Sequence, residues 1–162
     1  MEGLNIREIL FRGQTRRYDE KVDMAGKKLP SNWVYGGLFP QNGNGDFAII
    51  YQMEPEIAKF SVYADTVGQY TGLMDKYGQK IFEGDILAGD RYPFTCDGER
   101  NYFAEVVWFE DCPAFGLYTI KNPHSSIAGI SSGNTELVDN WDASQWEIVG
   151  NIFDNPELTT QN

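Results

Sequence analysis

Turn-forming residues recur at short intervals along this chain, and their spacing constrains the fold more than any other feature of the sequence. Residues 41–46 read QNGNGD, Asp75–Gly78 reads DKYG, and Gly84 separates Glu83 from Asp85. Gly and Asn tolerate the positive φ angles of tight turns, and Asp accepts hydrogen bonds from the backbone that follows it. With seventeen Gly and seven Pro in the chain, we predict many short strands and few long helices.

Apolar and β-branched runs between these turns define the expected elements. Strands are expected at 6–13, 33–40, 47–52, 67–71, 79–82, 86–87, 102–109, 115–120 and 145–153. For 6–13 a helix stays open, because its apolar residues also fit the i, i+3, i+4, i+7 spacing. Short helical turns are expected at 55–60, where Pro55 suits a first turn, and at 137–141. Residues 14–32 and 121–135 are expected to be long connections.

Together these elements predict a mainly β fold with a minor α+β component. We expect a small, bent, barrel-like antiparallel sheet over about residues 62–153, with an N-terminal hairpin at 33–52 and long loops. The Gly36–Gly37 pair indicates a bulge or a close backbone approach. At 162 residues the chain has the size of one domain, 1–162, with sub-parts at 1–60 and 61–158.

Charge and composition exclude several classes of function. The formal net charge of −11 repels phosphate backbones, which argues against general nucleic-acid binding. The basic residues between Arg12 and Lys28 are diluted by Asp19, Glu20 and Asp23 and are typical of a solvated loop. Apolar runs stay shorter than the roughly 18 residues of a membrane span, and the N-terminus is unlike a secretory signal. We therefore expect a cytoplasmic protein with Cys96 and Cys112 as reduced thiols.

Five fragments of the sequence resemble a known family. They are FRG at 11–13, WVYGGL at 33–38, TVGQYTGLMDKYGQKIFEGDIL at 66–87, VVWFEDCPAFGLY at 106–118 and WEIVGNIFDNPEL at 146–158. In this order they are similar to the YopX-like proteins of bacteriophages and prophages, with TVGQYTG…IFEGDI as the specific part. The segment between Arg12 and Trp33 is longer than in that family. The resemblance implies phage or prophage origin, a location in the host bacterial cytoplasm and homo-oligomerisation, but no reaction and no catalytic residue.

The sequence contains few histidine and cysteine residues that could form a metal site or a nucleophile. His124 is the sole histidine, and Cys96 and Cys112 lack the paired short spacings of zinc sites. A nucleophile pair of Cys112 with His124 would need an activated thiol beside the imidazole, whereas Cys112 precedes Pro113 in an expected turn. An inert thiol is the preferred interpretation.

Acidic residues offer a second candidate chemistry. Asp65, Asp75, Glu83 and Asp85 could hold magnesium or calcium, which prefer oxygen ligands. Each also lies at a turn or at the start of a strand, where carboxylates hydrogen-bond nearby backbone amides, and we prefer this structural interpretation. The loop Asp97–Glu99 is too short a match to a calcium-binding loop.

Glycines and aromatic residues also have a structural interpretation that is preferred to a functional one. Gly68, Gly72, Gly78 and Gly84 fit turns, because a phosphate loop would need a helix after the strand. An aromatic platform for single-stranded nucleic acid would need a basic groove, so we expect core packing for its candidate members. These members are Trp33, Tyr35, Tyr70, Phe82, Trp108 and Trp146.

We therefore expect no catalytic, cofactor-binding or metal-binding residue and a non-enzymatic, self-associating protein-interaction module. The first alternative is an acidic inhibitor of a host nucleic-acid-binding protein, which requires carboxylates gathered on one face. The second alternative is a metal-dependent enzyme that uses Asp65, Glu83 and Asp85. Expected partners are other copies of the chain and a host protein, without nucleic acid or membrane.

Overall fold

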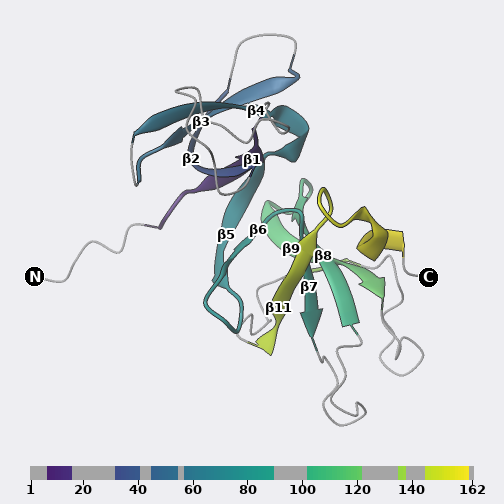
Figure 1. The fold of residues 1–162 in the computed structure, drawn as a ribbon. Coiled ribbons are helices and arrows are strands. Elements are labelled where there is room, and N and C mark those ends of the chain that lie inside the picture. Colours follow the sequence, from purple (N-terminus) through teal and green to yellow (C-terminus); the bar gives the residue numbers. More distant parts are fainter. Residues whose placement is uncertain are drawn as a thin grey trace, which may run out of the picture. The chain divides into compact units, whose positions relative to one another are not determined.

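The computed structural model of the chain describes residues 7–15, 32–40, 45–54, 57–89, 102–121, 135–137 and 145–160. Within these ranges the chain forms strands and short 3-10 turns but no α-helix, which confirms the mainly β prediction (Figure 1). The strands are β1 Phe11–Gln14, β2 Trp33–Pro40, β3 Phe47–Gln52, β4 Ala58–Tyr63, β5 Gly68–Met74, β6 Lys80–Phe82, β7 Asp85–Gly89, β8 Tyr102–Phe109, β9 Ala114–Lys121, β10 Thr135–Leu137 and β11 Glu147–Asn151. The 3-10 helices are η1 Ala64–Thr66 and η3 Pro156–Thr160. None of the helices in the described ranges has the length and apolar character needed to span a membrane.

The strands form two antiparallel sheets. The first has the order β4-β3-β2-β1-β5-β6 and the second the order β10-β9-β8-β7-β11. The barrel-like expectation is wrong, because the described strands do not close either sheet. In the first sheet, the end of β1 meets β4 only at an isolated bridge between Thr15 and Val62. A barrel needs a continuous hydrogen-bonded ladder between the first and last strands, and one bridge does not provide it.

The chain divides into two compact units, Met1–Gly72 and Leu73–Asn162, and the boundary lies within β5. Each unit has its own core. In the first unit, alternate residues of β2, β3 and β4 point inward, and the buried cluster consists of Val34, Ala48, Ile50, Phe60 and Val62. The prediction of one domain with sub-parts at 1–60 and 61–158 stays a prediction.

The core of the second unit lies on one face of the second sheet. Its buried members are Ile81, Leu87, Tyr102, Ala104, Val106, Phe115, Leu117 and Trp146. The rings of Tyr102 and Trp146 meet edge to face with 4.9 Å between their centroids. The Tyr102 hydroxyl is 2.6 Å from the Thr119 hydroxyl, so this buried polar group has a partner.

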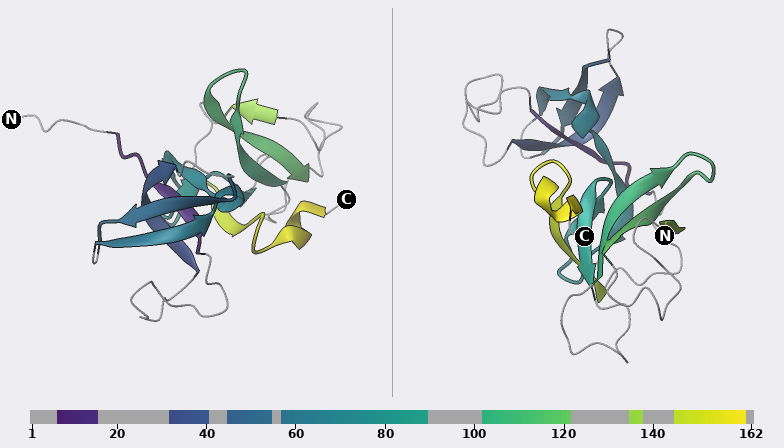
Figure 2. Two further views of the ribbon diagram at one scale, coloured as in Figure 1. Left: turned by 90° about the horizontal axis from the view of Figure 1, so that it is seen from above. Right: turned by 90° about the vertical axis from the view of Figure 1, so that its right-hand side faces the viewer.

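Local predictions succeeded at the hairpins. Strands β2 and β3 pair antiparallel as expected, with Leu38 opposite Ile50, and the β8–β9 hairpin extends as a two-stranded ribbon in the right-hand view of Figure 2. The open choice at 6–13 is settled as a strand for β1, although the strand begins only at Phe11. The loop expected at 14–32 lies mostly outside the described residues, and so does most of 121–135.

One helical turn, expected at 55–60, was predicted wrongly within the described ranges. The segment 58–60 belongs to β4, where Phe60 pairs with Ile50 and is buried. The Pro55 signal is local, whereas this strand is fixed by its ladder with β3 and by burial of alternate residues. Of the turn expected at 137–141, only Leu137 is described, and it ends strand β10, paired with Gly116. The rest of that prediction lies outside the described residues.

The close backbone approach predicted at Gly36–Gly37 is confirmed at Gly36. A Cβ atom on Gly36 would lie 1.9 Å from the carbonyl oxygen of Tyr51, whereas a Cβ on Gly37 would have no atom within 4 Å. Gly36 pairs with Phe11 of β1, and Gly37 pairs with Tyr51 of β3. Strand β2 therefore passes from one partner strand to the other at these two glycines, and the first of them has no room for a side chain.

Candidate functional site: the aromatic face of the first unit

Asp75 has the structural role that its place in a turn predicted. One of its carboxylate oxygens accepts hydrogen bonds from the backbone amides of Tyr77 and Gln79 at 2.8 and 2.9 Å. The other oxygen accepts the amide of Ile148 at 3.2 Å. The side chain is buried, and its three amide partners tie the β5–β6 turn to β11. A carboxylate used in this way has little capacity left for a ligand.

In the Glu83–Asp85 turn, Asp85 also accepts a hydrogen bond from the backbone. The Asp85 carboxylate accepts a hydrogen bond from the Phe82 amide at 2.8 Å, and the Asp85 side chain is almost fully buried, with 1% exposure. Gly84 between them has a φ of 81°, a left-handed conformation that favours glycine. The turn chemistry predicted for this motif is confirmed, and Glu83 stands beside it as a half-buried carboxylate.

Asp65 belongs to the first unit, whereas Glu83 and Asp85 belong to the second. It is exposed and sits in η1 of the first unit, two residues after the end of β4 rather than at the start of a strand. Among the described residues, no group of three or more His, Cys, Asp or Glu side chains is arranged to hold a metal ion. Cys112 is an exposed free thiol in the β8–β9 turn, and Cys96, His124 and the loop Asp97–Glu99 lie outside the described residues.

The six aromatic candidates divide between core and surface. Tyr70, Phe82 and Trp146 are buried as predicted. Trp33 is half-buried, with the guanidinium carbon of Arg12 4.7 Å from its ring centroid, a distance suited to a cation–π contact. The core prediction is wrong for Tyr35 and Trp108, which are each 42% exposed.

The exposed Tyr35 is part of a larger surface on the first unit. Alternate residues of β2, β3 and β4 point away from the core. Register pairs Phe39 with Ile49 and Phe47 with Tyr63, while Tyr35 lies on the part of β2 that pairs with β1. We call this surface the aromatic face, and it consists of Tyr35, Phe39, Phe47, Ile49, Tyr51 and Tyr63. Phe39 is its most exposed aromatic residue at 62%.

Ring contacts organise the aromatic face. Phe39 and Tyr51 meet edge to face with 6.2 Å between centroids, and Phe47 and Tyr63 pair across β3 and β4 at 5.6 Å. The remaining outward positions on these strands are Trp33, Gly37, Lys59 and Ser61, so no carboxylate lies among them. Because apolar surface in water is unfavourable, such a face is suited to contact with another molecule.

The sequence of β3 carries a signal for this face. In FAIIYQ at 47–52, both alternating sets of β3 side chains are largely apolar. A strand exposed on one side normally alternates between apolar and polar residues, whereas a strand covered on both sides reads as a continuous apolar run. The run therefore indicates that β3 has a second contact surface opposite the core.

Comparison with protein families identifies the chain. The family model described as YopX protein matches residues 31–160. The chain belongs to the YopX family. Four of the five fragments that carried the resemblance lie inside the match, and FRG at 11–13 precedes it. A search of curated proteins found no match.

Among solved structures, this YopX-family chain is similar to the crystal structure of protein EF1440 from Enterococcus faecalis. The two sequences are 20% identical, and the TM-score is 0.44. The alignment covers 95% of this chain and 99% of the other. Neither the family description nor the name of this structure states a reaction or a ligand.

Proposed function

We propose that this YopX-family chain is a non-enzymatic protein-interaction module that self-associates through the aromatic face, made by a phage or prophage for use in the host cytoplasm. The aromatic face is the observation that supports it. It lies on a regular three-strand surface, so its side chains are held in fixed positions and lose little conformational freedom on binding. Rigid aromatic side chains of this kind are the residues that dominate protein–protein interfaces.

Charge favours a second copy as the occupant. Each chain carries a net charge of −11, so two copies repel one another over most approaches. The outward positions of β2–β4 carry Lys59 and no carboxylate. The exposed carboxylates of Asp46, Glu54 and Asp65 lie in the segments that flank these strands, so the strand surface itself is where a second copy meets the fewest like charges.

The size of the face is sufficient to nucleate an interface. At about 150–250 Å² for each aromatic side chain, the exposed parts of Tyr35, Phe39, Tyr51 and Tyr63 amount to roughly 300–450 Å². A standard interface buries about 800 Å² on each partner. The exposed Met53 and Ile57, in the connection between β3 and β4, extend the apolar surface toward that size.

The test is a double substitution, Phe39→Ser with Tyr51→Ser, studied by light scattering coupled to size exclusion. We expect the wild type to be heavier than its 18.4 kDa monomer at micromolar concentration. The double variant should dissociate roughly a hundredfold more readily, because it loses two central aromatic contacts. Tyr77→Ser is the matched control, since Tyr77 is an exposed aromatic residue of the second unit. A monomeric wild type, or equal association of all three proteins, would contradict the proposal.

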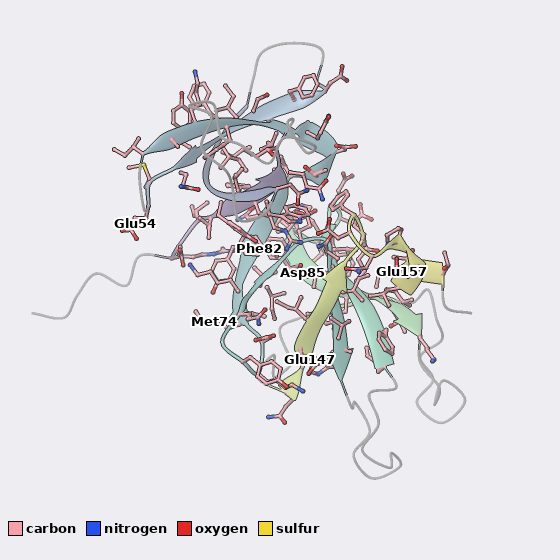
Figure 3. All side chains as sticks on the ribbon, viewed as in Figure 1. Glu54, Met74, Phe82, Asp85, Glu147 and Glu157 are labelled. Carbon is pink, nitrogen blue, oxygen red and sulfur yellow. The ribbon has the colours of Figure 1, made fainter. Side chains whose placement is uncertain are left out.

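A second candidate function is supported by the distribution of charge in the second unit. Strand register places the Glu83–Gly84 turn, the β8–β9 turn and the segment after β11 at one end of the second sheet. Exposed or half-buried carboxylates gather there: Glu83, Glu110, Asp111, Asp154 and Glu157. The described lysines of this unit lie elsewhere, with Lys121 at the far end of β9 and Lys76 and Lys80 around the β5–β6 turn. In Figure 3, Asp85 and Glu157 lie toward this acidic end and Glu147 toward the other.

Such a surface complements the basic face of a nucleic-acid-binding protein, the alternative partner expected from the sequence. The test is affinity purification from the bacterial host with wild type and with a Glu110→Gln, Asp111→Asn, Glu157→Gln variant. A nucleic-acid-binding protein retained by the wild type should be lost from the variant. Glu54→Gln with Asp46→Asn is the control, because it removes exposed charges from the first unit. Retention by every form, or by none, would remove this candidate.

A further inference from the structure

Strand register divides the centre of the outward surface of β2–β4 into two neighbouring rows. The first row runs across the three strands as Phe39, Ile49 and Ser61, and the second runs as Gly37, Tyr51 and Lys59. Positions two residues apart on a strand lie on the same side of the sheet, roughly 7 Å from one another. Both rows therefore face away from the core of the first unit.

The two rows differ in height, and the difference reverses from β2 to β4. On β2, Phe39 protrudes with 62% exposure, whereas Gly37 has no side chain and a Cβ atom there would meet no atom within 4 Å. On β4, Ser61 is short and half-buried, whereas Lys59 is long and exposed. Each row therefore has one protruding end and one recessed end, and the two rows are opposite in this respect.

A pattern of this kind is complementary to itself under two-fold symmetry. In a symmetric dimer the same patch is used by both copies, so that residue i contacts residue j and j contacts i. When the axis lies in the contact plane and runs between the two rows, each row faces the other row of the second copy. Phe39 then lies over Gly37 of the second copy, and Lys59 lies over Ser61.

Packing and charge both favour this register over a direct stacking of like rows. Facing sheets lie about 10 Å apart, and their side chains interdigitate. A ring over a glycine fills the space, whereas two rings would hold the sheets apart and two glycines would leave a cavity. At the other end, the Lys59 ammonium faces a hydroxyl that can accept its hydrogen bond instead of a second ammonium.

We propose that two copies of the chain pair through the aromatic face in this register, with Gly37 as the socket for Phe39 of the second copy. The inference rests on the self-association proposed above and adds the symmetry, the register and the residue that determines specificity. A second copy presents an open position exactly where Phe39 protrudes, so the pattern selects self over other apolar surfaces.

Exchanging the two β2 residues tests the register. Gly37→Phe puts two rings opposite each other and Phe39→Gly puts two glycines opposite each other, so each should raise the dissociation constant at least about tenfold. The combined Gly37→Phe, Phe39→Gly variant again places a ring over a glycine, and its dissociation constant should return to within about threefold of the wild type. Light scattering over a concentration series measures all four proteins, and circular dichroism checks that each variant is folded.

Charge at position 61 tests the other end of the rows on chains that keep Gly37 and Phe39. Ser61→Glu faces Lys59 of the second copy, whereas Ser61→Lys places ammonium groups opposite each other. At low salt we expect Ser61→Glu to associate severalfold more tightly than Ser61→Lys, and the difference should shrink at high salt. Because the wild-type charge is −11, repulsion between whole copies predicts the reverse order, so the sign of the difference is decisive.

The outcomes separate this register from the self-association on which it rests. A monomeric wild type overturns both. An associating wild type that is weakened by Phe39→Ser with Tyr51→Ser, but whose exchange variant is no tighter than its single variants, keeps the aromatic face and overturns the register alone. Ser61→Lys associating as tightly as Ser61→Glu overturns the register as well, and this pair decides if the exchange variants do not fold.

Discussion

Gly36→Ala is expected to lower the free energy of unfolding of the first unit by about 3 kcal/mol or more, the upper range for overpacked positions. The reason is geometric. An alanine Cβ would stand 1.9 Å from the Tyr51 carbonyl oxygen, and that atom belongs to the backbone of β3. A flexible side chain could move away, whereas the carbonyl can move only if the β2–β3 ladder is broken.

The neighbouring glycine provides a matched control. A Cβ on Gly37 would meet no atom within 4 Å, so Gly37→Ala should change the stability by less than about 1 kcal/mol. Urea unfolding of both variants, followed by circular dichroism, measures the difference. Equal stabilities of Gly36→Ala and Gly37→Ala would show that β2 does not approach β3 as described.

Asp75→Ala is expected to destabilise the second unit by roughly 3–5 kcal/mol, because each buried group left unsatisfied costs about 1–3 kcal/mol. The substitution removes the acceptor of the Tyr77, Gln79 and Ile148 amides in one step. Two of these bonds shape the β5–β6 turn, and the third joins that turn to β11. The neighbouring ion pair of Lys76 with Glu147, 2.6 Å between nitrogen and oxygen, should weaken as well, since the turn holds Lys76 in place.

A graded series separates the hydrogen bonds from the mere loss of a carboxylate. Asp75→Asn keeps the oxygen that accepts the Tyr77 and Gln79 amides but places an NH₂ group toward the Ile148 amide, so its loss of stability should be intermediate. Asp111→Ala, at an exposed position of the β8–β9 turn, should stay within about 0.5 kcal/mol of the wild type. Thermal and urea unfolding measure the series, and similar values for Asp75→Ala and Asp111→Ala would contradict the structural role of Asp75.

Only part of the aromatic face could be predicted from the sequence. The aromatic ring of Tyr35 predicts a core position. Its exposure, however, depends on which side of β2 faces the core, and that side carries Val34, which packs in the cluster with Ile50. Phe39 and Tyr51 are far apart in the chain, and only the register of β2 with β3 brings their rings together.

The turn chemistry was decided by the sequence itself. Gly78 and Gly84 adopt positive φ angles of 77° and 81°, and Asp75 and Asp85 bind backbone amides within four residues of themselves. These features depend on contacts between neighbours along the chain, so the amino-acid types and their spacing are enough to predict them. The many short strands between the turns follow for the same reason.

The tertiary structure decided what those strands build. The segment 58–60 became a strand because β3 offered it a ladder, and the expected barrel became two sheets because closure depends on pairing between strands that are distant in sequence. The same holds for the aromatic face. Turns are fixed by short-range hydrogen bonds and φ preferences, whereas sheet edges and outward faces exist only after long-range pairing has selected one register.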